Sequence, residues 1–502
     1  MTDGATPVPL ERLPTGIAGF DRISGGGLPR GRDALVLGRP GAGKTVLALQ
    51  FLAEGIRRFG EHGVFVTLGE RPEDLRRNAA SLGFDVSGWE RAGAWRFVDA
   101  SPADDETVVV GGFDFSGLAT RTLAAVRAVG ATRVVIDSVS AAFVRFTDAA
   151  TVRWALHGLL GVLRDAGVTT LLTAEDGDEL SREYVRISEH ASDAIVRLDH
   201  RANGDRRRRT VEVVKLRGGR HRSGAYPFTI RAPGGIAAVP LGGVSLSQTV
   251  SDERVSTGHD GLDAMCGGGL FRDSVVIVAG ATGAGKSLVA TTFLVEGLAR
   301  GERALFVGFE ESAGQVLRNM RNWSNDVGDA LEEGRLELLC RYPETGAIEE
   351  HLVDITDRMD ALRPQRLVID SLTALERITG EQGFREFVMA MSGQVKERRI
   401  TGLYTVATSL FGGDHPTEAQ ASVLADTILL LRYLETGGSL VRTLSVLKMR
   451  GSAHDTHVRE LTIDGDGLHI GEALDHHPTG RPPAEDTRRK AEDTRDTGSA
   501  PP

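Results

Sequence analysis

The chain has 502 residues, carries a formal net charge of −10 at pH 7 and contains two cysteines. This length allows about two to four domains, the acidic balance disfavours constitutive nucleic-acid binding, and two cysteines give neither a disulfide framework nor a metal cluster. No stretch approaches the ~18 continuous apolar residues of a membrane span, so we expect a cytoplasmic protein that binds no membrane and no nucleic acid stably.

The first motif in chain order is a glycine-rich phosphate-binding loop. The stretch Gly-Arg-Pro-Gly-Ala-Gly-Lys-Thr fits the pattern G-x-x-x-x-G-K-[ST]. Gly38, Gly41 and Gly43 let successive backbone N–H groups face one concavity. Lys44 can then reach the outer phosphates of ATP, and the Thr45 hydroxyl is placed to hold Mg²⁺.

Two acidic positions follow, each just after a short apolar strand. Glu70 follows the run 63–66, and Asp137 ends the run 134–136. The carboxyl end of a buried strand is where an α/β sheet offers ligands to a metal ion and its phosphate, so we expect Asp137 to hold Mg²⁺. Glu70 is predicted to orient a hydroxyl or a water for attack on the γ-phosphate. The alternatives are a helix cap for Asp137 and a solvated helix start for Glu70.

A pair of cations stands near the end of the first half. Lys215 and Arg217 occupy alternate positions of a predicted strand, so their side chains point the same way. They lie far along the chain from their own phosphate loop, which suits contact with the nucleotide of a neighbouring subunit. Ordinary surface charge is the alternative. The arginine run 206–209 just upstream is predicted to form a solvated hairpin.

The second half of the chain repeats these motifs at a nearly constant spacing. A second phosphate loop follows the apolar run 275–278 and precedes a predicted helix over 288–299; its residues are Gly280, Gly283, Gly285, Lys286 and Ser287. The remaining repeats are Asp370 for Asp137, Glu311 for Glu70, and Lys448 and Arg450 for Lys215 and Arg217. The halves differ at one acidic position, because the second half has Glu310 where the first has Gly69.

Each half alternates β-branched runs with segments of helical periodicity such as 120–129 and 149–165, which is the pattern of a parallel sheet with helices on both faces. The predicted fold class is therefore α/β, with two tandem RecA-like P-loop domains. We expect an arm over residues 1–12, a first domain over 13–245, a second over 246–474 and a disordered tail over 475–502. The first half is longer by a predicted surface loop near 103–112.

Taken together, the duplicated openings, phosphate loops, acidic strand ends and Lys-x-Arg-Gly strands resemble the KaiC family, over about Leu13 to Leu474. The resemblance implies a homohexamer of two stacked rings, with ATP bound between subunits. It further implies ATP hydrolysis in the first ring, and serine/threonine autophosphorylation and dephosphorylation in the second. The expected function is a timing or signalling scaffold whose state is read by signalling protein partners.

The resemblance also implies roles for particular residues. Glu310 would be the base for phosphoryl transfer, and Ser422 matches the first of two adjacent phosphoacceptors, whereas Val423 replaces the second. The cations that would sense the neighbour's γ-phosphate are Lys215, Arg217, Lys448 and Arg450. Two other functions stay open: a RecA- or DnaB-like motor on DNA, and a nucleotide-gated interaction platform with little turnover.

Overall fold

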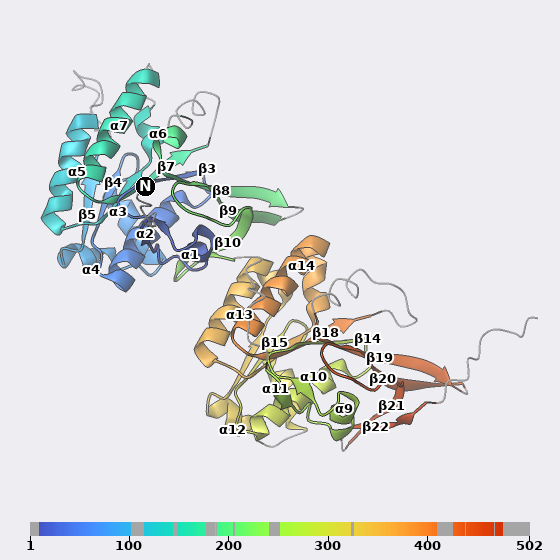
Figure 1. The fold of residues 1–502 in the computed structure, drawn as a ribbon. Helices are drawn as coiled ribbons and strands as arrows, with labels where there is room; N and C mark the ends of the chain where they lie inside the picture. Colours follow the sequence, from blue (N-terminus) through green and yellow to red (C-terminus); the bar gives the residue numbers. More distant parts are fainter. Residues whose placement is uncertain are drawn as a thin grey trace, which may run out of the picture.

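The computed structural model describes residues 10–101, 115–143, 149–176, 186, 188–203, 206–239, 251–322, 326–408, 425–436, 438–465 and 467–474. Within these residues the chain forms two α/β domains, each built on a nine-stranded sheet (Figure 1). None of the helices in these ranges combines the length and apolar character needed to span a bilayer. The expected loop near 103–112, the boundary at 245 and the tail over 475–502 lie outside the described residues.

The first domain contains these elements in chain order: β1 (Arg12–Leu13), α1 (Phe20–Ser24), β2 (Leu28–Pro29), β3 (Asp33–Gly38), α2 (Lys44–Phe59), β4 (Gly63–Thr67), α3 (Pro72–Ser81), α4 (Val86–Arg91), β5 (Trp95–Asp99), α5 (Phe115–Val129), β6 (Arg133–Asp137), α6 (Val139–Phe143), α7 (Ala149–Asp165), β7 (Thr169–Glu175), β8 (Ala194–Asn203), β9 (Arg206–Leu216), β10 (Ala225–Arg231) and β11 (Gly235–Ala238).

The second domain repeats this order: β12 (Arg254–Val255), α9 (Asp260–Met265), β13 (Leu270–Phe271), β14 (Val275–Gly280), α10 (Lys286–Ala299), β15 (Ala304–Gly308), α11 (Ala313–Arg321), α12 (Val327–Glu332), β16 (Leu336–Cys340), α13 (Ile348–Leu362), β17 (Arg366–Asp370), α14 (Leu372–Glu397), β18 (Thr401–Ala407), β19 (Thr427–Thr436), β20 (Ser439–Met449), β21 (Arg459–Asp464) and β22 (Gly467–Ala473). Gly380, at φ 66°, interrupts α14 with a kink.

The two sheets have the same strand order. The first is β11-β10-β9-β8-β3-β7-β6-β4-β5, and the second, viewed from the corresponding edge, is β22-β21-β20-β19-β14-β18-β17-β15-β16. Six strands of each sheet are parallel, and three antiparallel strands extend one edge. The predicted tandem α/β fold is confirmed. Residues 206–209 open β9, which forms a hairpin with β8, but the prediction of a solvated run is wrong for Arg208, which is partly buried in ion pairs with the second domain. The antiparallel extension was not predicted.

Each sheet is covered on both faces because its strands are apolar on both. In β3, Leu35 and Leu37 pack with α5 and α7, whereas Ala34 and Val36 pack with α2 on the opposite face. Strand β14 alternates in the same way between the layer of α13 and α14 and the layer of α10 and α11. Continuous apolar runs of this kind are typical of parallel sheets buried between helices.

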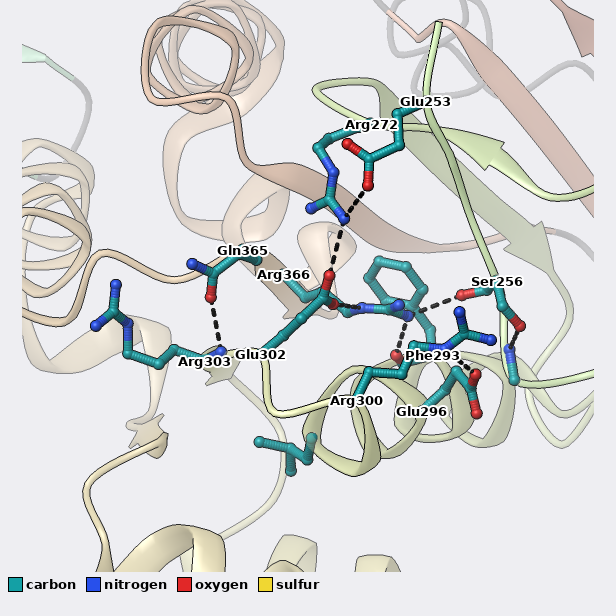
Figure 2. Close-up of polar contacts among 12 residues, drawn as sticks. Glu253, Ser256, Arg272, Phe293, Glu296, Arg300, Glu302, Arg303, Gln365 and Arg366 are labelled. Atoms are coloured by element: carbon teal, nitrogen blue, oxygen red, sulfur yellow. Dashed lines mark hydrogen bonds and ion pairs between the residues drawn. The ribbon is translucent and has the colours of Figure 1, made fainter. Parts of the chain in front are cut away.

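A fully buried arginine ties each domain together. Arg133 donates hydrogen bonds to Glu61, to the Phe51 carbonyl at 2.9 Å and to the Pro14 carbonyl at 2.8 Å. The second domain repeats this network around Arg366, whose partners are Glu302, Phe293 and Ser256 (Figure 2). Because a buried charge is stable only when paired and hydrogen-bonded, this arginine fixes the start of a strand, a helix and the domain opening in one arrangement.

The domains contact each other through β9 and β10 of the first and α13 and α14 of the second. Arg208 lies 2.8 Å from Glu349 and also pairs with Glu386. Arg231 pairs with Asp357 at 2.6 Å. Apolar residues of the first domain, including Val239, join the α13 and α14 layer of the second core, so the contact is both apolar and charged.

Candidate functional site

Both phosphate loops lie at the carboxyl end of the central strand of their sheet. Gly43 and Gly285 each have φ 106°, a left-handed conformation that glycine adopts without strain. A Cβ on Gly38 would lie 2.5 Å from the Leu198 carbonyl oxygen, so a larger residue is excluded there. Helix α10 begins at Lys286 rather than at the predicted residue 288, so the loop lysine itself opens the helix.

The loop lysines point back into their own loops. The Lys44 ammonium donates to the Gly38 carbonyl at 2.9 Å, and the Lys286 ammonium donates to the Ala281 carbonyl at 2.9 Å. Burial lowers the pKa of both lysines, and neighbouring carboxylates partly oppose this shift. A phosphate oxygen would be a stronger acceptor than these neutral carbonyls, because hydrogen bonds between charged groups are stronger than neutral ones.

Six of the predicted first-domain residues meet in one cavity of about 610 Å³, whose lining includes Gly41, Gly43, Lys44, Thr45, Glu70 and Asp137. Asp137 is 7% exposed and accepts a hydrogen bond from the Thr173 hydroxyl. Burial raises the pKa of Asp137, whereas hydrogen bonds from Thr173 and Thr45 and the charge of Lys44 oppose the rise. The carboxylate therefore sits directly beside the loop hydroxyl and the loop lysine.

In the second domain, three of the corresponding residues share a cavity, whereas Lys286 and the loop glycines are not among its lining residues. A cavity of about 300 Å³ is lined by Ser287, Glu311 and Asp370 among others. Asp370 accepts a hydrogen bond from the Thr405 hydroxyl, as Asp137 does from Thr173. Neither threonine was singled out from the sequence, although each stands in a β-branched strand next to the strand that carries the aspartate.

The acidic residues after β4 and β15 occupy equivalent places. The Leu68 amide donates to the Asp137 carbonyl, and the Phe309 amide donates to the Asp370 carbonyl, both at 2.8 Å. The next residues are therefore Gly69 in one domain and Glu310 in the other. Burial raises the pKa of Glu70, and the charges of Asp137 and Asp74 raise it further. Glu310 instead forms an ion pair with Arg377 at 3.3 Å.

One charged residue of the first cavity was missed. Glu175 ends β7, lines the cavity, and places its carboxylate 4.0 Å from the Lys44 ammonium. The signal was available, since Glu175 ends a β-branched strand just as Asp137 does. The equivalent residue at the end of β18 is Ala407, so a search for repeated motifs passes over Glu175.

The Lys-Arg pairs lie away from the phosphate loops of their own domains. Lys215 aligns across the sheet with Leu35, through Ile195 of β8. Leu35 precedes Gly38 by three residues, which corresponds to about 10 Å along β3. Its ammonium donates to the Glu189 and Ser192 carbonyls at 2.8 Å. Burial lowers its pKa, as does the adjacent charge of Arg217.

The other three cations of this set follow the same pattern. Arg217, just after β9, pairs with Asp193 at 3.3 Å. Lys448 in β20 donates to the Ala425 carbonyl at 2.9 Å, and Arg450 lies 3.7 Å from Asp426. All four therefore lie at the amino-terminal rim of their sheets, opposite the loops. Ser422 and Val423 fall outside the described residues.

Two phosphate loops at the carboxyl ends of matching α/β sheets, each near an aspartate that ends a neighbouring strand, define a tandem RecA-like P-loop protein. The family described as "ATPase: KaiC" matches residues 13–242 and 255–475. The chain belongs to the KaiC family of ATPases.

Curated relatives agree along almost the whole chain. The Circadian clock protein KaiC3 of Synechocystis sp. is 45% identical over 473 residues, which cover 94% of this chain and 92% of the relative. The Circadian clock oscillator protein KaiC of Parasynechococcus marenigrum is 42% identical over 473 residues, covering 94% and 92%. That of Thermostichus vulcanus is 44% identical over 467 residues, covering 93% and 90%.

Proposed function

We propose that this chain is an ATP-dependent homohexamer that hydrolyses ATP in its first domain and phosphorylates itself in its second. The observation that carries the proposal is the separation of each Lys-Arg pair from the phosphate loop of its own domain. Because loop and pair lie at opposite rims of one sheet, a site that contains both needs a second copy of the chain. A ring of subunits gives every loop a pair from its neighbour.

In this proposal ATP binds with Mg²⁺. The Thr45 hydroxyl beside the Asp137 carboxylate, and Ser287 near Asp370, offer the oxygen ligands that Mg²⁺ prefers. The part of the chain that the structure describes contains no cluster of three or more His, Cys, Asp or Glu side chains able to hold a metal alone. This suits a cation that is held by one carboxylate, one hydroxyl, phosphates and water, and that neutralises phosphate charge.

The carboxylates divide the chemistry between the domains. Glu70 would orient the water that attacks ATP in the first domain. Glu310 and Glu311 would take the proton from an attacking hydroxyl in the second, with Ser422 as the acceptor. Lys215, Arg217, Lys448 and Arg450 would contact the γ-phosphate of the neighbouring subunit.

The process that such a ring serves is proposed from its relatives, whose names place them in circadian clocks. A scaffold that couples slow ATP turnover to its own phosphorylation would act in timing or signalling, with partner proteins that read its state. The net charge of −10 weighs against a DNA motor.

The test combines assembly with phosphorylation. Light scattering should find hexamers with a non-hydrolysed ATP analogue and smaller species without it, and Lys44→Ala should prevent assembly. After incubation with Mg-ATP, intact mass should increase by phosphate, and Ser422→Ala should remove the label. A monomer under both conditions would reject the hexamer. Assembly without phosphate release would leave a nucleotide-gated platform, and turnover that rises with added DNA would favour a motor.

A further inference from the structure

A second large cavity lies in the second domain, at the opposite rim of the sheet from the phosphate loop. Its volume is about 710 Å³, and five arginines line it: Arg272, Arg303, Arg363, Arg398 and Arg399. They stand just before the first residues of four neighbouring parallel strands, β14, β15, β17 and β18. Since the shortest of these strands has five residues, the cavity is roughly 13 Å or more from the phosphate loop of its own domain.

The cavity carries more positive charge than its carboxylates neutralise. Arg272 pairs with Glu253 at 2.8 Å and with Glu302 at 2.9 Å (Figure 2), and Arg398 pairs with Asp360 at 2.7 Å. Among the described residues, Arg303, Arg363 and Arg399 have no ion pair within 4.0 Å. All three of these side chains are exposed.

Two of these arginines occupy backbone positions that favour glycine. Arg363 follows α13 at φ 51°, and Arg399 follows α14 at φ 57°. The first domain has glycine at both equivalent positions, Gly130 at φ 64° after α5 and Gly167 at φ 74° after α7. An L-residue is strained in this left-handed region, whereas glycine is not. The first domain therefore shows that the fold does not require arginine at either position and can form with glycine at both.

The helix dipole accounts for part of this arrangement only. Cations are favoured near helix carboxyl ends, and α13 and α14 both end at this rim. The dipole would favour an arginine one residue earlier in the chain equally well, so it does not explain why the arginine occupies the strained left-handed position. It also does not account for Arg303, which precedes β15 and replaces His62 of the first domain. What the five arginines share is the cavity that they face.

We propose that this cavity binds a small anion with two or more phosphoryl groups. Guanidinium groups present planar, paired donors that match phosphate oxygens, and a cluster of them recognises phosphate better than lysines do. Two further carboxylates lie beside this lining: Glu302, which pairs with both Arg272 and Arg366, and Asp273, whose charge acts on Arg399. With Arg366 included, six arginines exceed the four carboxylates, Glu253, Asp273, Glu302 and Asp360, by two, so a single monovalent anion would leave charge uncompensated. The volume is within the range of small-molecule sites and exceeds the size of one phosphate. A nucleotide and an inorganic polyphosphate share this chemistry.

The test uses the full chain with both phosphate loops saturated by Mg²⁺ and a non-hydrolysed ATP analogue. Tripolyphosphate binding is then measured by calorimetry, and the double variant Arg363→Gly/Arg399→Gly should lose at least tenfold in affinity. Because this variant copies the first domain and relieves two strained positions, its unfolding temperature should not fall. The matched control, Arg77→Ala/Arg91→Ala, removes two exposed arginines of the first domain and should bind as the parent does.

Three further outcomes decide the proposal. Equal affinity in the parent and the Arg363→Gly/Arg399→Gly variant, or an equal loss in the control, would overturn the site. A glutamate peptide of the same charge that binds as tightly as tripolyphosphate would overturn the phosphoryl class. The affinity of ATP for the cavity is compared with that of tripolyphosphate. Tighter binding of ATP would mean that the ligand is a nucleotide, whereas equal affinities would mean that the phosphate chain alone is recognised.

Discussion

The Lys44 ammonium lies 4.0 Å from the Glu175 carboxylate, at a place where the second domain has Ala407. The second domain instead has Glu310 where the first has Gly69. Each nucleotide site therefore has three nearby carboxylates. Two of them occupy equivalent positions in the two domains, whereas the third ends β7 in the first domain and follows β15 in the second. The sets are Glu70, Asp137 and Glu175 in one domain and Glu310, Glu311 and Asp370 in the other.

Replacing Glu175 with Gln should tighten ATP binding to the first domain, because it removes a carboxylate that would repel the phosphates. The expected gain in affinity is about two- to fivefold, since this carboxylate is half-exposed and interactions between exposed charges contribute little to a binding free energy. The measurement is nucleotide titration in a Lys286→Ala background. The reciprocal change, Ala407→Glu in a Lys44→Ala background, should weaken binding to the second domain. Weaker binding by Glu175→Gln would mean that this carboxylate positions Lys44 for the phosphate.

Replacing Gly69 with Glu should increase phosphate release by the first domain, because it restores the second carboxylate of the pair. A Cβ at this position meets nothing within 4 Å, so the side chain fits. General-base positioning contributes about 10²- to 10⁴-fold, which sets an upper limit for the gain. Gly69→Gln is the matched control without a charge. An unchanged rate would show that Glu70 is sufficient.

Replacing Asp137 with Asn should stabilise the nucleotide-free first domain at pH 7 while abolishing its ATP turnover. Burial raises the pKa of Asp137, so the folded state loses this proton at higher pH than the unfolded state does. Ionised Asp137 therefore lowers the free energy of unfolding above the raised pKa, and this penalty is relieved as pH falls through it.

The expected gain for Asp137→Asn is about 1 kcal/mol, the usual scale of a single substitution. Denaturant unfolding at several pH values tests this, with the more exposed Asp74→Asn as the control. The gain should shrink with falling pH and vanish below the ordinary aspartate pKa of about 4. A gain that did not change with pH would exclude the ionisation as its cause.

Replacing Arg208 with Ala should weaken the contact between the domains, because it leaves Glu349 and Glu386 facing each other without a cation. A loss of about 1–3 kcal/mol is expected for unpairing half-buried charges. Calorimetry should then resolve two unfolding transitions where the parent shows more coupled unfolding. The additional change Glu386→Gln should recover part of the loss; if it recovers none, the ion pairs are not coupled.

The duplication made most of the fold predictable from sequence. Once a phosphate loop, an acidic strand end and a Lys-x-Arg-Gly strand recur in order, the second domain repeats whatever the first adopts, and the observed strand orders agree. The antiparallel edge was not predictable in the same way. The alternation of apolar and polar residues does not by itself determine which strands pair or in which register, so the pairing of these edge strands could not be predicted.

The site was predictable where its residues repeat and was missed where they do not. Asp137 and Asp370 are recognisable because both halves carry them, whereas Glu175 stands in one half alone. The arginine cavity was missed for another reason: a positive φ at Arg363 or Arg399 depends on how a helix end meets the next strand. The glycines of the first domain at the same places were the only sequence signal.

The buried arginines have a consequence for synthesis of the chain. Arg133 binds the Pro14 carbonyl across 119 residues, and Arg366 binds the Ser256 carbonyl across 110 residues. During synthesis, the first residues of each domain can therefore take their final place only after the strand that carries the buried arginine has emerged from the ribosome. Because the two intervals do not overlap, the first domain can complete this step while the second is still being translated, so equivalent strands of the two halves compete little for the same place in a sheet.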